Sequence, residues 1–255
     1  MTYVSTVNAD SPAAFWECQD TSGSLTDSTG AGHTASVAGS GMSYSVQGPG
    51  PYNAVRLIGN SQSGWQAADN DVWSSRDFTL EAWIKPNSGI GGATQYWMMK
   101  HYNGFVGEWW TTLDFDGTNL ATTAVVAKPD LWDAHLNTTT STTTEPHCGW
   151  HHLVVTMDDT AHVLKSYIDG VLVDTDSTPT GSHSTNVSGV LAIGHHPGRV
   201  NSGGNVYSVS GDMAMVAFYD HALSAARIAA HFKAMPYTWC PNPNPGGWTV
   251  GYVGW

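Results

Sequence analysis

The sequence predicts an all-β protein made of many short strands. Glycine, serine, threonine, asparagine and aspartate recur roughly every ten residues, and short apolar runs lie between them. Turn-forming Asn-Gly and Asp-Gly pairs separate several of these runs, and at least one run alternates strictly between apolar and polar residues. A chain of 255 residues can bury a sizeable core, and β-sandwiches of this length often form a single unit.

The first half of the chain contains the clearest predicted strand, at 78–85. Its sequence FTLEAWIK places Phe, Leu, Ala and Ile on one face and Thr, Glu, Trp and Lys on the other, and a proline then ends it. Shorter strands are predicted at 12–18 and 53–58. Residues 20–32, which are polar and rich in glycine, are predicted to form a loop between these two strands.

Turn dipeptides place the hairpins in the middle of the chain. Asn103-Gly104 predicts a hairpin that joins 95–102 to 105–115, and the Asp-Gly pair after it predicts a turn into a strand at 119–127. Residues 128–149 contain the run TTTSTTTE and show no periodicity, so they are predicted to form a long exposed loop.

The second half of the chain adds further strands and one helix. Strands are predicted at 150–157, 189–194 and 211–219, and a hairpin over 162–175 is predicted to turn at an Asp-Gly pair. The helix is predicted at 224–235, where Ser224 is the N-cap, Ile228 and Phe232 share a face, and Pro236 ends the helix.

The order of these segments resembles the laminin-G-like, concanavalin-A-like family of jelly-roll domains. The resemblance covers roughly residues 3–235 and is carried by ADSPAAFWECQDTSGSLTDSTGAGH (9–33), FTLEAWIKP (78–86), WHHLVVTMD (150–158), SYIDGVLVD (166–174), LAIG (191–194) and GDMAMVAFYDHALSAARIAAHF (211–232). It implies a two-sheet antiparallel jelly-roll sandwich with one short C-terminal helix. A fold of this kind specifies function only weakly.

The last twenty residues differ from the rest in composition. They have no charged side chain and combine prolines and glycines with five aromatic residues, namely Tyr237, Trp239, Trp248, Tyr252 and Trp255. Such a segment is a liability in water, so we expect it to pack on its own domain or, preferably, on a neighbouring protein. The expected organisation is therefore a domain at 1–235 and an anchor or assembly tail at 236–255.

Charge and composition exclude several classes of partner. The net charge is −12 and the sequence has no basic cluster, so binding to nucleic acid or to an anionic membrane is not expected. No apolar run approaches the ~20 residues of a membrane span. The N-terminus shows no secretory signal pattern. Cys18, Cys148 and Cys240 are odd in number and widely spaced, so no disulfide framework is implied.

No catalytic residues are expected. Glucanases of the resembled fold carry paired carboxylates on one strand as Glu-x-Asp-x-x-Glu, and none of the four glutamates belongs to such a motif. Glu81 shares a strand face with Trp83 and is expected to be solvent-facing or paired. The run from His147 to His152, which includes Cys148, has zinc-binding residue types, but strand alternation separates His151 from His152.

Calcium is the metal that the resemblance favours. Relatives often bind it near the loop at 20–32, where this sequence offers Asp20 and Asp27, with help from a late strand that here supplies Asp212. The match is incomplete, because Ala214 stands where many relatives have an aspartate. The alternative is that these aspartates cap turns.

Aromatic residues near loops are the candidates for contact with sugars. They are Tyr102, Trp109, Trp110 and Trp132. Adjacent residues of a strand face opposite ways, so at least one of Trp109 and Trp110 is expected to leave the core. A core or interface role is the alternative for each of the four residues.

The leading hypothesis is a non-enzymatic virion surface protein. With its laminin-G-like opening, its aromatic tail and no secretory signal pattern, the chain is similar to domains of tailed-bacteriophage capsid and tail proteins. The implied partners are other virion proteins, further copies of the chain and host-surface glycans. A free-standing or secreted carbohydrate-binding module is the first alternative, and a degenerate glycoside hydrolase is the second.

Overall fold

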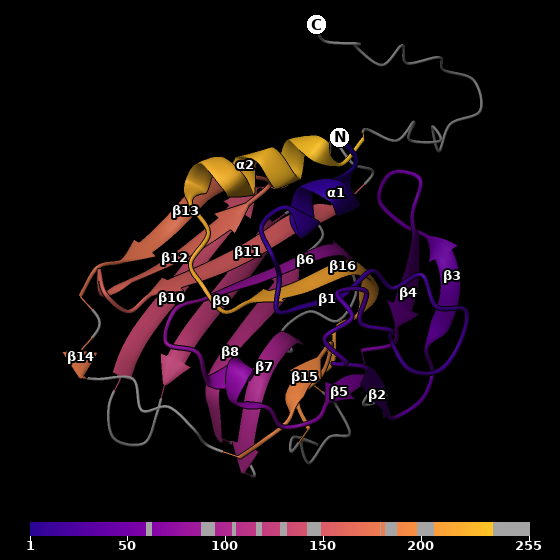
Figure 1. Cartoon of the computed structure of the whole chain (residues 1–255), viewed down its shortest axis with the longest axis horizontal. Coiled ribbons are helices and arrows are strands. Elements are labelled where there is room, and N and C mark those ends of the chain that lie inside the picture. The colour runs from indigo at the N-terminus through magenta and orange to yellow at the C-terminus, as the bar shows by residue number, and fades with distance from the viewer. Residues whose placement is uncertain are drawn as a thin grey trace, which may run out of the picture.

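The structure is a computed structural model that describes residues 1–59, 63–87, 95–103, 106–115, 119–127, 132–141, 149–178, 180–181, 188–197 and 207–236. Two antiparallel sheets of eight strands each pack face to face, and two helices cover the outer face of one of them (Figure 1). This is the antiparallel jelly-roll sandwich with a short C-terminal helix that the sequence predicts.

We call the sheet beneath the helices sheet A. Its strand order is β13-β12-β11-β6-β16-β4-β3, and β1 also pairs with β16. Its strands are β1 (Ala14–Trp16), β3 (Ser43–Gln47), β4 (Asn53–Leu57), β6 (Phe78–Pro86), β11 (His151–Asp158), β12 (Val163–Ile168), β13 (Val171–Asp176) and β16 (Gly211–Tyr219).

We call the second sheet sheet B. Its strand order is β14-β10-β9-β8-β7-β15-β5-β2. Its strands are β2 (Ala35–Ala38), β5 (Gly64–Ala67), β7 (Gln95–Asn103), β8 (Val106–Phe115), β9 (Asn119–Ala127), β10 (Trp132–Ser141), β14 (Thr180–Gly181) and β15 (Leu191–Ile193). A 3-10 helix, η1 (Asp71–Ser74), precedes β6.

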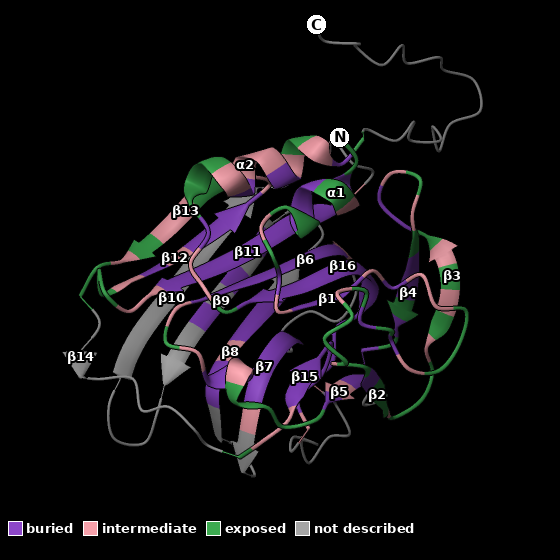
Figure 2. Cartoon of the chain, in the orientation of Figure 1, coloured by how far each residue is buried: buried purple, intermediate pink, exposed green. Residues whose placement is uncertain are grey.

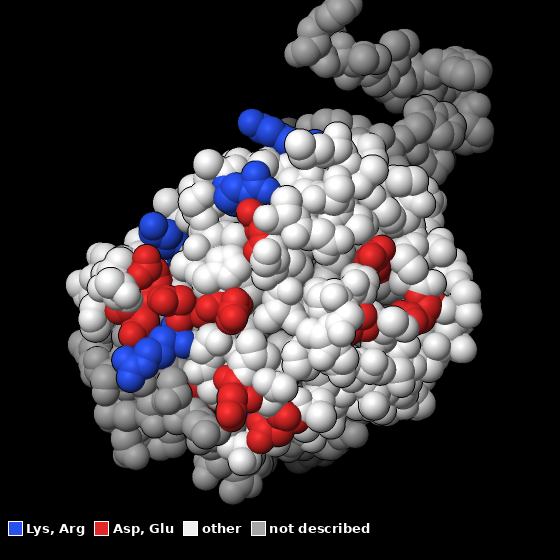
Figure 3. All heavy atoms as spheres, in the orientation of Figure 1, with Lys and Arg blue, Asp and Glu red and all other residues white. Residues whose placement is uncertain are grey.

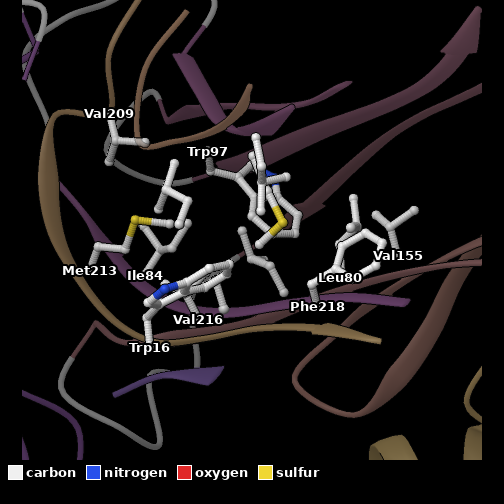
Figure 4. Close-up of a cluster of buried hydrophobic side chains, with 14 of the residues drawn as sticks. Trp16, Leu80, Ile84, Trp97, Val155, Val209, Met213, Val216 and Phe218 are labelled. Carbon is white, nitrogen blue, oxygen red and sulfur yellow. The ribbon is translucent and has the colours of Figure 1, made fainter. Parts of the chain in front are cut away.

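The main core lies between the two sheets. Figure 4 shows side chains from both sheets and from adjoining segments meeting there, among them Trp16, Ile84, Trp97, Met213 and Phe218. Six of the twelve tryptophans have less than 2% of their surface exposed, so much of the aromatic content serves packing. Figure 2 shows that the central strands of sheet A are buried along most of their length, whereas β3 and β13 at its edges are exposed in part.

Strand β6 confirms the predicted alternation and shows why both of its faces are buried. Phe78, Leu80, Ala82 and Ile84 join the main core, whereas Trp83 belongs to a second apolar cluster on the outer face of sheet A. Helices α1 (Tyr3–Asn8) and α2 (Ala225–Ala234) pack on that outer face (Figure 1). Thr79, Glu81 and Trp83 of β6 are therefore buried on this outer face, whereas Lys85 near the end of the strand is half-buried.

Local signals in the sequence account for the C-terminal helix and the best-defined hairpin. The hydroxyl of Ser224 caps α2 by accepting a hydrogen bond from the amide of Arg227, as expected for an N-cap. Strands β12 and β13 pair around Asp169-Gly170, where both residues have positive φ. The pairings of β7 with β8 and of β8 with β9 confirm the two predicted central hairpins.

Two predictions need correction. Residues 128–149 are not one long loop, because β10 occupies 132–141 and pairs along its whole length with β9 except at its first residue. Threonine favours β-structure, so the threonine-rich run suits a strand despite its lack of alternation. Helix α1 was not anticipated, since six residues are too few to display a helical period. The tail residues 237–255 lie outside the described part of the chain.

Candidate functional site

The adjacent tryptophans of β8 point to opposite sides of sheet B. Trp109 lies in the main core with 1% of its surface exposed, and its indole nitrogen donates to the carbonyl of Trp73 at 3.0 Å. Trp110 lies on the outer face and is half-buried. The predicted division of this pair is confirmed, and the candidate role of Trp109 in contacting sugars is wrong because its ring is enclosed.

A row of aligned residues crosses the outer face of sheet B at Trp110. Cross-strand pairing aligns Gln66 of β5 with Ala192 of β15, Ala192 with Met99 of β7, and Met99 with Trp110. Side chains at directly paired positions lie on the same face. Met99 and Ala192 are each 0% exposed, so other side chains cover the middle of the row, and Gln66 and Trp110 are its partly exposed members.

Four more ring-bearing residues gather on the same side. The ring of Tyr96 meets that of His196 edge-on at 4.7 Å and that of Tyr207 at 6.0 Å. The ring centroids of His101 and His196 are 5.6 Å apart. Tyr96 and Tyr207 pack in one apolar cluster with Met99 and Trp110. We call Tyr96, His101, Trp110, His196 and Tyr207 the aromatic face.

The surroundings of the aromatic face contain a neutral histidine. Burial lowers the pKa of His195 to about 4, so this imidazole is uncharged at neutral pH. The Nε2 atom of His195 lies 3.4 Å from the Nε2 atom of Gln66, which belongs to the row described above. Tyr96, His195 and His196 are buried, with 7%, 2% and 1% of their surface exposed. The partly exposed residues that a ligand could touch here are Gln66, His101, Trp110 and Tyr207.

The other predicted sugar contacts are located only by their backbones. Tyr102 lies in β7 and Trp132 in β10, both in sheet B, and their side chains fall outside the described residues. Sequence reasoning missed Tyr96, His101, His196 and Tyr207 as members of such a site. Tyr96 stands at the start of a strand and Tyr207 follows a glycine-rich stretch, so no local pattern indicated that they meet.

The three aspartates proposed for calcium do not form one site. Both carboxylate oxygens of Asp27 accept backbone amides, from Phe15 and Thr29 on one oxygen and from His33 on the other. Burial alone raises the pKa of Asp27, but these hydrogen bonds outweigh it and lower the pKa. Asp27 thus organises the turn at 27–33, which is the alternative role stated for it above.

The remaining two aspartates are also engaged elsewhere. Asp20 accepts the amide and the hydroxyl of Thr26, and Asp212 forms a bidentate ion pair with Arg56. Within the described ranges, no three His, Cys, Asp or Glu side chains converge on a point that could hold a metal ion. The predicted calcium set of Asp20, Asp27 and Asp212 is therefore not supported by the geometry.

A buried acid-base cluster lies on the other side of the molecule. Oε1 of Glu81 accepts the hydroxyl of Tyr3 at 2.6 Å and lies 2.7 Å from Nε2 of His152, and Oε2 accepts the hydroxyl of Tyr219 at 2.9 Å. Nδ1 of His231 lies 3.0 and 3.1 Å from the two oxygens. We call these five residues the Glu81 network.

The Glu81 network extends to the edge of the helices. Nε2 of His231 lies 2.7 Å from Asp10, and Asp10 also accepts the guanidinium of Arg227. Burial raises the pKa of Glu81, but the charges and hydrogen bonds of His231 and His152 outweigh burial and hold the pKa well below its usual value. Burial alone would lower the pKa of His231. The charges and hydrogen bonds of Glu81 and Asp10 outweigh the effect of burial, so the pKa of His231 is raised.

The residue types of the Glu81 network resemble those of a catalytic centre, but its position does not. Glu81, His152 and His231 are each 0% exposed, so a substrate cannot reach them. The network joins α1, β6, β11, β16 and α2, and its geometry indicates that it fixes the two helices on sheet A. Glu81 is therefore paired, one of the two states expected for it from the sequence.

The histidines considered as zinc ligands are divided between separate partners. His151 lies 2.9 Å from Asp169 through Nδ1, whereas His152 belongs to the Glu81 network. His147 and Cys148 lie outside the described residues, as does Cys240. Cys18 is buried and is a free thiol.

The two-sheet jelly roll defines a lectin-like sandwich fold. The chain belongs to the concanavalin A-like lectin/glucanases superfamily, whose laminin-G-type model matches residues 59–229. No curated protein matches the chain significantly in sequence.

Solved structures with the same fold share little sequence with this chain. Domain 4 of AbnA, a GH43 extracellular arabinanase from Geobacillus stearothermophilus solved with arabinotriose, matches with a TM-score of 0.56 and 21% identity over 86% of this chain and 97% of the domain. A botulinum neurotoxin type C structure, described as depending on two ganglioside molecules for cell entry, matches with a TM-score of 0.58 and 15% identity. That match covers 92% of this chain and 53% of the neurotoxin chain.

A sialidase extends this comparison to an enzyme. The Trypanosoma rangeli sialidase matches with a TM-score of 0.55 and 14% identity over 86% of this chain, which spans only 32% of the sialidase. At these identities the likeness shows the fold and nothing more specific.

Proposed function

We propose that this chain is a non-catalytic carbohydrate-binding domain and that the aromatic face is its ligand-binding surface. The observation that carries the proposal is the position of Trp110, which is half-buried on the outer face of sheet B beside Met99 and Ala192. Its partner in sequence, Trp109, already serves the core. The core therefore does not account for Trp110.

The chemistry of the aromatic face fits a saccharide. The C–H faces of a pyranose or furanose ring are apolar, so they pack on an indole or phenol ring, while the hydroxyls need uncharged donors and acceptors nearby. Trp110 and Tyr207 supply partly exposed rings, and Gln66 supplies an amide beside the neutral His195. Tyrosine and tryptophan are suited to such surfaces because they are large, rigid and amphipathic.

The comparisons support the same class of ligand. The arabinanase domain was solved with arabinotriose and the neurotoxin is described with gangliosides, both of which contain sugar. The match covers 97% of that arabinanase domain, so the comparison is with one separate domain of the enzyme. This support comes from the fold, and the residues of the aromatic face carry the assignment to this chain.

The absence of catalysis is part of the proposal. Glu81 and Glu108 are buried, with 0% and 1% of their surface exposed, so neither can flank a glycosidic bond. Glu17 is half-buried and Glu145 lies outside the described residues. A hydrolase would need two accessible carboxylates that face each other across a cleft.

The virion surface is the setting we propose for this binding activity. An acidic chain with a net charge of −12 and an uncharged aromatic tail at 236–255 suits display on a particle that contacts host glycans. Figure 3 shows few and scattered basic side chains on the face in view. No described helix is long and apolar enough to cross a membrane. Mass measurement of the chain with and without the tail tests whether the tail drives assembly.

The binding proposal is tested by a glycan array followed by calorimetry on the best ligand. Trp110→Ala is expected to raise Kd roughly 30-fold, because truncation of a tryptophan at the centre of a binding surface costs about 2 kcal/mol. Trp110→Phe, which keeps a ring, is expected to retain most of the affinity. Leu172→Ala is the matched control, since Leu172 is an exposed apolar residue on β13 of sheet A. Unchanged Kd in Trp110→Ala would refute the assignment.

A further inference from the structure

A polar pocket opens at the end of sheet A, away from the Glu81 network. It has a volume of about 260 Å³, which is enough for one sugar ring, and is lined by Arg56, Leu57, Lys85, Pro86, Asn87, Gly211 and Asp212. These residues come from the ends of β4 and β6 and the start of β16. Neither the family match nor the aromatic face assigns a role to this pocket.

Two cations flank one carboxylate in a single row across the pocket. Asp212 pairs in register with Arg56 on one side and with Lys85 on the other, so the three side chains lie on the same face of sheet A. Two of the nine basic residues of a chain with a net charge of −12 therefore meet at this point. The row carries a net charge of +1, counted as two cations and one carboxylate.

The two cations differ in how they are held. Nε and Nη2 of Arg56 donate to the two oxygens of Asp212 at 2.7 and 3.0 Å, and this bidentate contact fixes the plane of the guanidinium. The Arg56 side chain nevertheless keeps 56% of its surface exposed, whereas that of Asp212 keeps 8%. Asp212 thus acts as a buried support that presents Arg56 to the pocket.

Lys85 and Asn87 supply groups that the protein itself does not use. Among the described residues, the half-buried ammonium of Lys85 has no hydrogen bond or ion pair, and the side-chain amide of exposed Asn87 has none either. The backbone amide of Asn87 donates to Ser210, which holds its position. A fixed guanidinium, an unpaired ammonium and an unpaired amide line one pocket.

Gly211 brings the strands close together at the base of the row. Its φ is +148°, and a Cβ atom there would lie 2.2 Å from the carbonyl oxygen of Lys85. A larger residue would therefore push β16 away from β6 and separate Asp212 from Lys85. The positive φ is a conformation that glycine adopts readily.

We infer that this pocket is a second site, which binds a sugar unit bearing a single anionic oxygen group, a carboxylate or a sulfate ester. The inference rests on the proposed carbohydrate-binding function. Arg56 and Lys85 neutralise the anion, and Asn87 contacts a hydroxyl. Arg56, Asp212 and Lys85 lie on the face of sheet A that carries the helices, so the pocket is on the opposite side of the sandwich from the aromatic face and is a separate site.

The test uses the full chain and two-dimensional NMR with glucuronic acid, glucose 6-sulfate and neutral glucose. Glucuronate or the sulfate ester is expected to shift the Arg56 Nε–H and Gly211 amide signals. At equal concentration, neutral glucose is expected to cause chemical-shift changes at least tenfold smaller at the same signals. Lys85→Gln is expected to weaken binding of the anionic sugar about tenfold, since hydrogen bonds to charged groups contribute about 1.5 kcal/mol or more. Lys165→Gln makes the same charge change on half-buried Lys165 of β12 and is the matched control.

Each outcome decides the inference. The proposed anionic-sugar site is overturned if Lys85→Gln binds the anionic sugar as tightly as the wild type, or if neither anionic sugar shifts the signals of Arg56 and Gly211. In that case, loss of neutral-glycan binding in Trp110→Ala would still support the aromatic face as a binding site. Equal shifts with sodium acetate or sodium sulfate would show an adventitious anion site only and also overturn the anionic-sugar site. Shifts with anionic sugars in a chain that binds no neutral glycan would support the pocket and count against the aromatic face.

Discussion

Replacing Glu81 by glutamine removes one charge from the centre of the Glu81 network without changing the volume of the side chain. Five contacts reach its two oxygens, from Tyr3 and His152 at Oε1, from Tyr219 at Oε2, and from His231 at both. A glutamine amide puts an NH₂ group in place of one of these oxygens. Whichever oxygen is replaced, a tyrosine hydroxyl and a histidine N–H then face another donor.

The expected cost follows from these lost contacts. A buried donor without an acceptor costs about 1–3 kcal/mol, and breaking a buried charge pair costs about 3–5 kcal/mol. We therefore expect Glu81→Gln to lower the free energy of unfolding by about 3–5 kcal/mol. In a chain of this size each kcal/mol corresponds to about 2–4 °C, so a loss of 3 kcal/mol lowers Tm by roughly 6–12 °C.

The assay is equilibrium urea unfolding followed by tryptophan fluorescence, with hydrogen exchange to locate the change. Glu17→Gln is the matched control, because Glu17 is half-buried and its side chain has no hydrogen bond within the described residues. Its unfolding free energy is expected to stay within about 0.5 kcal/mol of the wild type. Exchange is expected to rise first in α1 and α2. Equal unfolding midpoints for both variants and the wild type would refute the reasoning.

Two further predictions concern pH and the Asp169-Gly170 turn. The lowered pKa of Glu81 gives stability that is fully present above the unfolded pKa near 4.5 and is lost on acidification, and the raised pKa of His231 gives stability that is fully present below the unfolded pKa of 6.5 and is lost as pH rises through the raised pKa. We therefore expect the urea midpoint to vary little between pH 4.5 and pH 6.5 and to fall on both sides of this range. A midpoint that rises steadily with pH would contradict this prediction. Gly170→Ala is expected to lower Tm more than Gly23→Ala. Both glycines have a φ of +76°, but only a Cβ atom at Gly170 would meet another residue, Phe232, at 2.9 Å. Equal losses of Tm, measured by calorimetry, would show that contact with Phe232 does not add to the cost of the substitution.

The sequence was sufficient wherever a local signal dominates. The alternation at 78–85, the Asp-Gly turn of the β12-β13 hairpin and the Ser224 cap each predict the element that the structure shows. Their physical causes act over a few residues, so no tertiary information is needed. The apolar run at 211–219 coincides with β16 for the same reason.

Long-range pairing accounts for what the sequence did not reveal. Glu81 lies 78 residues from Tyr3 and 150 from His231, and nothing local indicates that these side chains meet. Alternation predicted that Trp109 and Trp110 face opposite ways, but not which of them faces the core, because that depends on which side of sheet B meets sheet A. The aromatic face itself depends on rings from four separate segments of sheet B and its connections.

The first described residue and the last, residue 236, lie next to α1 and α2 in the chain, which has a consequence for how this domain is presented. Helices α1 and α2 pack on the same outer face of sheet A (Figure 1), and an ion pair joins Asp10, which follows α1, to Arg227 of α2. Both points of attachment therefore lie on the side opposite the outer face of sheet B. A bead, a scaffold or a neighbouring domain attached at residue 1 or at residue 236 would leave that surface directed outward, and a shortened chain that ends at 236 is a good candidate for circular permutation.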